Sequence, residues 1–233
     1  MPPATIAAWP LAWVAGMLPL LGTLIAYPLS VQLGLVEACN PFVDGCTSIS
    51  RAARHGLPNH LFRAFLLPAA ALQALVWLLC SVWLRDSAAQ AAHPSRPSRS
   101  LAVLPWVGLL AAGFLVLYGT FLGTEGEAYR WMRRYGIVGY FGGTSVAMLL
   151  CTRGLLKSRW RAHASVRVIY ALCLALPLLG LVNSLGPLWL GGAASRDALQ
   201  NVTEWWGGLI FTLFFFALAW IWRSTRFRLS LTR

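Results

Sequence analysis

The feature that most constrains this chain is a succession of six apolar windows, each about long enough to cross a lipid bilayer as a helix. The hydrocarbon core of a bilayer is about 30 Å thick, and crossing it takes roughly 20 apolar residues in a helix. The approximate bounds of the windows are 9–34, 61–84, 101–122, 135–152, 166–190 and 205–222. We therefore predict an all-α, polytopic membrane protein in which residues 1–233 form a single bundle of six transmembrane helices.

The composition favours the same fold. Hydrophobic residues make up 58% of the chain and charged residues only 11%, which is too little polar surface for a soluble protein of this length. No Lys or Arg precedes the first window. A cleaved signal peptide normally begins with basic residues, so we interpret this window as a retained span. Six helices and their short loops use up the length, and no extra-membrane domain is expected.

The distribution of basic residues predicts an orientation, because Lys and Arg in short loops favour the cytoplasmic side. If the N-terminus lies inside, 12 of the 19 basic residues fall inside and seven outside. We therefore predict that both termini face the cytoplasm, in a bacterial inner membrane. Basic helix ends also account for the net charge of +12, so nucleic acid is not an expected partner.

Acidic residues are still more asymmetric under this orientation, since six of the seven fall outside. One interpretation is that they balance the outer arginines, as Glu127 would with Arg130 one helical turn away. The other is that the outer face carries a functional site. The six outer acids are Glu37, Asp44, Glu125, Glu127, Asp197 and Glu204.

Two cysteines bracket a short outer segment with the sequence CNPFVDGC, from Cys39 to Cys46. Its proline and glycine favour a tight turn. In an oxidising compartment such as a bacterial periplasm, these two residues are expected to form a disulfide. A pair of unlinked thiols is the alternative.

Small residues at helical spacing predict where helices approach closely. Gly139 and Gly143 form a GxxxG pair in the fourth window, and Gly119 and Gly123 form another at the end of the third. We expect both pairs to pack helices within the bundle.

No motif predicts a cofactor or a metal site. The histidines lie in loops or at window boundaries, so a haem ligated within the membrane is not expected. A zinc site would have to combine His55 and His60 with distant acids, and their spacing does not suit it. Ser48 and Ser50 lie near His55 and Asp44, but no GxSxG elbow surrounds either serine.

A transporter usually carries ionisable or unwound positions in the middle of its spans. Here Asn183 is the most notable polar interruption. It is explained equally by a hydrogen bond between helices and by contact with a substrate.

Three patches carry a family resemblance. The first runs from Cys46 to Leu79 and includes Ile49 and Ser50, Ala53 and Gly56, Pro58 and Phe62. The others are YGIVGYFGG (135–143) and NVTEWW (201–206). Together with the six-span plan, they resemble the Frag1/DRAM/Sfk1 family, which includes relatives of a protein acting after attachment of glycosylphosphatidylinositol lipids. The resemblance implies lipid handling or lipid-linked regulation. This chain departs from the family pattern at Arg51 and Arg133, which replace an acid and a histidine.

We therefore expect an outer-face pocket for lipid headgroups or a lipid-linked substrate, with membrane lipids as partners. Arg63 and Arg130 would bind phosphate. Glu204 would be the best-placed acid, at the start of the last span, because a helix N-terminus favours negative charge. The alternative is a non-catalytic membrane subunit or scaffold of a larger envelope complex. The pocket candidates are His55, His60, Arg63, Glu125, Glu127, Arg130, Asn201 and Glu204.

Overall fold

Seven helices and two short strands lie within residues 4–89 and 99–231, the part of the chain that the computed structural model describes. Six of these helices are long and apolar enough to cross a membrane, which confirms the predicted all-α, six-helix transmembrane fold. The strands are β1 (Ala4–Ala7) and β2 (Arg228–Leu231), and the helices are α1 (Trp9–Gln32), α2 (Ile49–Ala52), α3 (Gly56–Ala89), α4 (Arg99–Phe121), α5 (Glu127–Lys157), α6 (Ala164–Trp189) and α7 (Ala193–Ser224).

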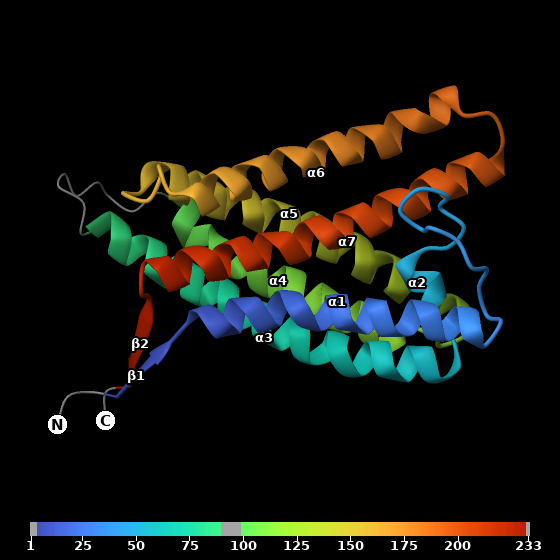
Figure 1. Cartoon of the computed structure of the whole chain (residues 1–233), viewed down its shortest axis with the longest axis horizontal. Coiled ribbons are helices and arrows are strands. Elements are labelled where there is room, and N and C mark those ends of the chain that lie inside the picture. The colour runs from blue at the N-terminus through green and yellow to red at the C-terminus, as the bar shows by residue number, and fades with distance from the viewer. Residues whose placement is uncertain (1–3, 90–98, 232–233) are drawn as a thin grey trace.

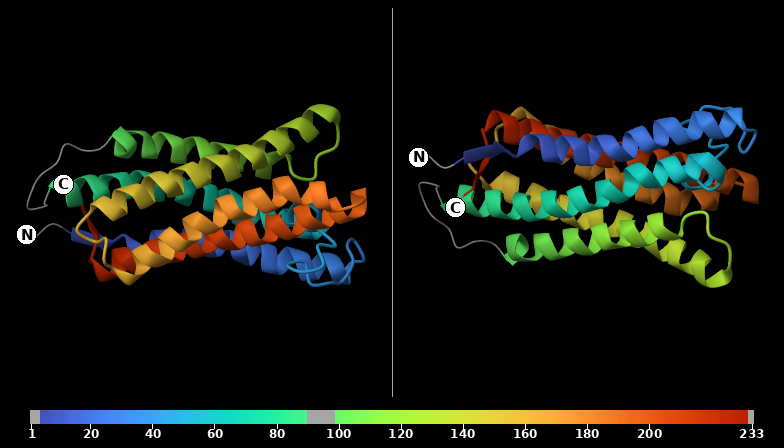
Figure 2. Two further views of the ribbon diagram at one scale, coloured as in Figure 1. Left: turned by 90° about the horizontal axis from the view of Figure 1, so that it is seen from above. Right: turned by 90° about the horizontal axis from the view of Figure 1, so that it is seen from below.

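The six long helices form a ring that follows chain order (Figures 1 and 2). Each long helix packs against the next one along the chain, and α7 returns to pack against α1. An even number of crossings brings both termini to one end of the bundle (Figure 1). We call this the terminal end. The opposite end carries α2 and the α4–α5 and α6–α7 connections, and we call it the α2 end.

A two-stranded ribbon closes the ring at the terminal end. β1 and β2 pair antiparallel, with Ala4 opposite Leu231 and Ala7 opposite Arg228. The ribbon was not predicted, because each strand has only four residues and lies outside the apolar windows. It joins the start of α1 to the end of α7.

The last helix begins 12 residues before the predicted window, at Ala193 instead of residue 205. Its first turns carry polar residues, which a hydropathy window excludes although they are helical. The predicted position of Glu204 at a helix start is therefore wrong, because this residue lies well inside α7. α5 likewise begins at Glu127, ahead of its apolar window.

Helices α4 and α5 approach closely at the first predicted glycine pair. A Cβ atom on Gly139 would lie 2.5 Å from the ring of Phe114, and one on Gly143 would lie 2.9 Å from the Cβ of Ala111. Since real Cβ atoms do not approach this closely, a larger residue at either position would require the neighbouring atoms to shift.

The second glycine pair is divided between two structures. Gly119 lies within α4, where an added Cβ would be 3.2 Å from the side chain of Leu67 on α3. Gly123 lies beyond the end of α4 with a φ of +86°, and its added Cβ would be 2.5 Å from the carbonyl oxygen of Arg54. Each therefore permits a close approach, but to different neighbours.

The core draws buried side chains from all six long helices. Trp77 of α3 and Phe214 and Phe215 of α7 are almost fully buried within it. The ring of Trp77 lies 5.6 Å from that of Phe214 and 5.5 Å from that of Phe215.

Candidate functional site

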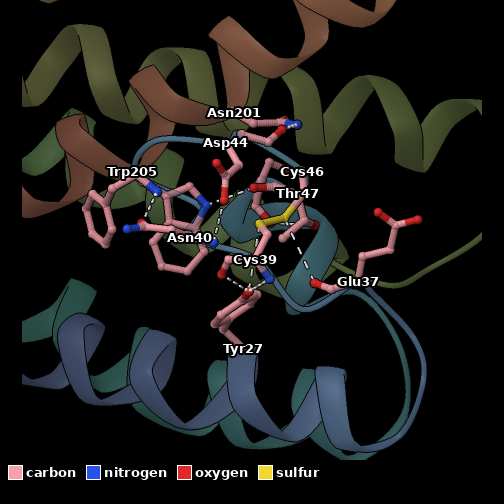
Figure 3. The surroundings of a disulfide bond; sticks show 12 residues. Tyr27, Glu37, Cys39, Asn40, Asp44, Cys46, Thr47, Asn201 and Trp205 are labelled. Atoms are coloured by element: carbon pink, nitrogen blue, oxygen red, sulfur yellow. Dashed lines mark hydrogen bonds between the residues drawn. A yellow bond between two sulfur atoms is a disulfide. The ribbon is translucent and has the colours of Figure 1, made fainter.

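The loop between Cys39 and Cys46 lies at the α2 end, next to helices α1 and α7 (Figure 3). Its Phe42 lines the first of two cavities that make up the candidate site. The disulfide predicted between these two cysteines is present. The hydroxyl of Tyr27 on α1 donates to the Cys39 carbonyl at 2.7 Å and accepts from the Cys39 N–H at 3.0 Å. Within the loop, the Asn40 N–H donates to the carboxylate of Asp44 at 2.8 Å. Both ends of the loop are therefore fixed.

Helix α7 holds the same loop from the other side. Gly45 has a φ of +62°, and a Cβ there would lie 2.2 Å from the Ala198 carbonyl oxygen, so the loop touches α7 at its backbone. Three α7 side chains also donate to loop carbonyls: Asn201 to Gly45 at 2.7 Å, Trp205 to Thr47 at 2.9 Å and Trp206 to Phe42 at 3.1 Å.

Glu204 is half-buried, and its carboxyl group lies between α7 and the start of α2. The backbone N–H and the hydroxyl of Ser50 both donate to one of its oxygens, each at 2.9 Å. The hydroxyl of Tyr118 on α4 in turn donates to the Ser50 hydroxyl at 2.9 Å. The charges of Arg54 and Arg51 act on the same carboxyl group. Three elements that lie far apart in the sequence thus meet at one acid.

Glu204 also lies where two cavities adjoin. The first has a volume of 110 Å³ and is surrounded by α1, α3, α4, α5 and α7, with walls that are largely apolar. Its polar lining residues are Thr23, Gln73, Tyr118, Tyr140, Glu204 and Thr212.

The second cavity has a volume of 530 Å³ and lies between α5, α6 and α7. It shares Ile137, Phe141 and Glu204 with the first, so the two are neighbours. Of the described residues lining either cavity, Glu204 is the one that carries a charge. The other polar lining residues of the second cavity are Ser145, Asn183, Gln200 and Thr203.

Asn183 combines the two roles considered for it. Its side-chain oxygen accepts a hydrogen bond from the Thr203 hydroxyl at 3.2 Å, which joins α6 to α7. It also lines the second cavity.

Of the eight residues predicted for the pocket, Glu204 alone lines either cavity. Asn201 is buried and serves to hold the loop at Gly45. Arg63 is half-buried on α3, and its Nε lies buried without a hydrogen-bond partner among the described residues. The remaining five are exposed at the α2 end and do not converge on the cavities: His55, His60, Glu125, Glu127 and Arg130.

The serines have partners other than His55. Ser48 caps the start of α2, since its hydroxyl accepts from the Arg51 N–H at 3.0 Å. Ser50 is bound to Glu204, and Asp44 to Asn40. The Ser, His and Asp arrangement considered from the sequence is thus not formed.

Tyr118 and Arg54 contribute to the site and were missed. Tyr118 stands alone as a hydroxyl-bearing aromatic residue in the third apolar window, and this is a usable signal. Arg54 carried no local signal, because its neighbours come from other elements.

Within residues 4–89 and 99–231, no three His, Cys, Asp or Glu side chains come together in a way that could hold a metal ion. Comparison of the chain with models of known protein families, with curated proteins and with solved structures gives no match. The functional interpretation therefore depends on the geometry of the site.

Proposed function

We propose that this membrane protein handles lipids, and that it binds the headgroup of a lipid or of a lipid-linked substrate at its α2 end. The observation that carries the proposal is the position of Glu204, where an apolar cavity inside the bundle adjoins a larger, partly polar one. Ligand sites are typically apolar cavities with a few convergent polar groups. An amphiphile fits this combination, with hydrocarbon against the apolar wall and polar groups near the carboxyl.

The two cavity volumes suit different parts of such a ligand. The first, at 110 Å³, is smaller than the cavity of about 150 Å³ that holds one benzene molecule, so it suits a short length of hydrocarbon chain. The second, at 530 Å³, falls in the range of about 300–1,000 Å³ typical of small-molecule sites. We assign the headgroup to the second cavity.

We further propose that the α2 end faces the periplasm of a bacterium and that both termini face the cytoplasm. Two observations support this orientation. The Cys39–Cys46 disulfide at the α2 end is typical of an oxidising compartment. The excess of basic residues in the loops of the terminal end is typical of a cytoplasmic face. The resemblance to the Frag1/DRAM/Sfk1 family supports lipid handling in the same way, and membership of that family is part of the proposal.

Replacing Glu204→Gln tests the proposal, with Glu127→Gln as the matched control. Glu127 lies at the same end but is exposed and lines neither cavity. Lipids that co-purify with each protein in mild detergent would be quantified by mass spectrometry. We expect Glu204→Gln to reduce the bound lipid about tenfold, the size expected for losing a charge-assisted hydrogen bond. Glu127→Gln should leave it unchanged. Equal lipid content in all three proteins would refute the headgroup site.

The second candidate, a non-catalytic subunit of a larger envelope complex, is favoured by helix α6. Only 11% of its span is buried within the chain, which leaves most of its surface for lipid or another protein. Purification in mild detergent separates the candidates, because an obligate subunit would retain a partner at fixed stoichiometry.

A further inference from the structure

Three arginines, Arg54, Arg130 and Arg133, gather beside the candidate site. Arg130 and Arg133 lie one helical turn apart on α5. The Arg133 side chain reaches the end of α4, where Gly123 lies against the Arg54 carbonyl, so three positive charges lie close together. Like charges at short range repel, and the repulsion is reduced when an anion lies among them. The cluster therefore has the electrostatic character of an anion site.

The backbone around these arginines is fixed by a buried amide. The side chain of Asn59 donates to the carbonyls of Ala53 at 2.9 Å and Leu122 at 3.1 Å. Asn59 thereby links Ala53, the residue before Arg54, to Leu122, the residue after the end of α4. At Gly123, the absent side chain leaves room for the Arg54 carbonyl.

The arginine side chains differ in what holds them. A guanidinium nitrogen of Arg133 donates to the carbonyls of Phe121 and Thr124, which fixes it at the end of α4. The Nε of Arg54 is buried and has no hydrogen-bond partner in the part of the chain that is described. A buried donor in this state costs free energy, and a bound acceptor would remove that cost.

Nearby acids do not fill this role. Glu204 acts electrostatically on Arg54, but its carboxyl group already accepts two hydrogen bonds from Ser50. Glu125 and Glu127 are exposed, and no ion pair joins them to the cluster among the described residues.

The arginine cluster lies near the ends of the apolar windows, where a membrane-spanning helix would reach the lipid headgroups. Arg54 precedes the window 61–84, and Arg130 and Arg133 precede the window 135–152. On α5, Trp131 and Tyr135 are exposed beside the cluster with stacked rings. Such aromatic residues are typical of the level of the lipid headgroups.

We infer that Arg54 and Arg133, with Arg130 at the rim, bind a phosphate group of a phospholipid or phosphate-bearing lipid. None of the three lines either cavity, so the phosphate lies beside the cavities while the rest of the headgroup occupies the second one. Guanidinium groups match phosphate oxygens in charge and in hydrogen-bond geometry. The lipid part of this inference rests on the proposed function. Inorganic phosphate has the same chemistry, and the experiment separates the two sources.

The test measures binding to the full-length protein in detergent by isothermal titration calorimetry. The three probes are dioctanoyl phosphatidic acid, dioctanoylglycerol and inorganic phosphate. The variants are Arg54→Gln and Arg133→Gln, and the control is Arg196→Gln, an exposed arginine of α7 at the same end. We expect each cluster variant to weaken phosphatidic acid binding about tenfold or more, as for a lost charge-assisted hydrogen bond. The control should match the original protein, and dioctanoylglycerol binding should be weaker and insensitive to the cluster variants.

Each other outcome counts against the inference. Equal binding of phosphatidic acid and dioctanoylglycerol would overturn the phosphate site and leave the proposed lipid site standing. Inorganic phosphate binding as tightly as phosphatidic acid would overturn the lipid source and the proposed function would lose support. If a glutamine variant does not fold, the charge-preserving variant Arg133→Lys is used in its place. The salt dependence of phosphatidic acid binding to the original protein is then measured as well. Binding that does not change with salt concentration would overturn the inference.

Discussion

Helices α6 and α7 are neighbours in the ring, yet they relate to the rest of the chain in opposite ways. The mean hydropathy of the α6 span is 2.1 and that of α7 is 1.7, but the buried share is 11% for α6 and 67% for α7. The less apolar helix is therefore the more buried one. Hydropathy indicates that a helix enters the membrane, and it does not indicate which helix forms the core.

The difference arises from what each helix presents to its neighbours. α7 places Phe214 and Phe215 against Trp77 in the core, and its polar first turns hold the disulfide loop through Asn201 and Trp205. α6 carries large apolar side chains that remain exposed. In lipid these side chains need no protein partner, because hydrocarbon solvates them equally well. α6 is thus free to serve as one wall of the second cavity.

The largest expected effect is on stability, from truncating a core residue of α7. Phe214 is fully buried, whereas Leu178 on α6 is 61% exposed. We expect Phe214→Ala to lower the free energy of unfolding by about 3 kcal/mol, because it leaves a cavity between packed helices. Leu178→Ala should change it by less than about 0.5 kcal/mol. Reversible unfolding in mixed micelles with increasing sodium dodecyl sulfate measures both, and similar losses would mean that α6 is also part of the core.

A smaller effect is expected from removing the disulfide that closes the loop on α7. The double replacement Cys39→Ser with Cys46→Ser should lower the free energy of unfolding by about 2 kcal/mol, since the unfolded chain regains loop entropy. Amide hydrogen exchange should increase in residues 193–206 of α7 and stay unchanged in α6. Cys173→Ser, a buried thiol of α6 outside the loop, is the control and should leave exchange at the start of α7 unaltered. Increased exchange confined to α6 would contradict this assignment of the loop.

The sequence predicted the membrane spans well where they are apolar throughout. The bounds of α1, α4 and α6 fall within two residues of the predicted windows. The polar starts of α5 and α7 were missed, because a hydropathy window excludes polar residues even where they are helical. The disulfide was predictable, since its cysteines lie seven residues apart in one short segment.

The candidate site was predicted only in part. Glu204 was identified because an acid stands out near an apolar window. Its partner Ser50 lies 154 residues away in the sequence, and Tyr118 comes from a third helix. Such a meeting point depends on how the helices are ordered in the ring, and no local pattern in one sequence encodes it. For the same reason, the exposed His55 and Glu125 were grouped with residues they do not contact.

The smallest expected effect on stability comes from a glycine of α6, and it tests whether the cavity that α6 walls is occupied. Gly180 lines the second cavity, and an added Cβ there would meet nothing within 4 Å. Gly113 on α4 has the same open surroundings but lines neither cavity. Replacing either residue with leucine should change the free energy of unfolding by less than about 1 kcal/mol, the cost of glycine in a helix.

The two replacements should differ in bound lipid, because only the leucine at position 180 extends into the cavity proposed for the headgroup. We expect Gly180→Leu to lower the lipid that co-purifies with the protein and Gly113→Leu to leave it unchanged, as measured by mass spectrometry. Since both variants add the same side chain to a membrane helix, a general effect on lipid contact would appear equally in both. Equal lipid content in the two variants would mean that α6 faces only bulk lipid. The difference between α6 and α7 would then be a difference in burial, with no role for α6 in binding a ligand.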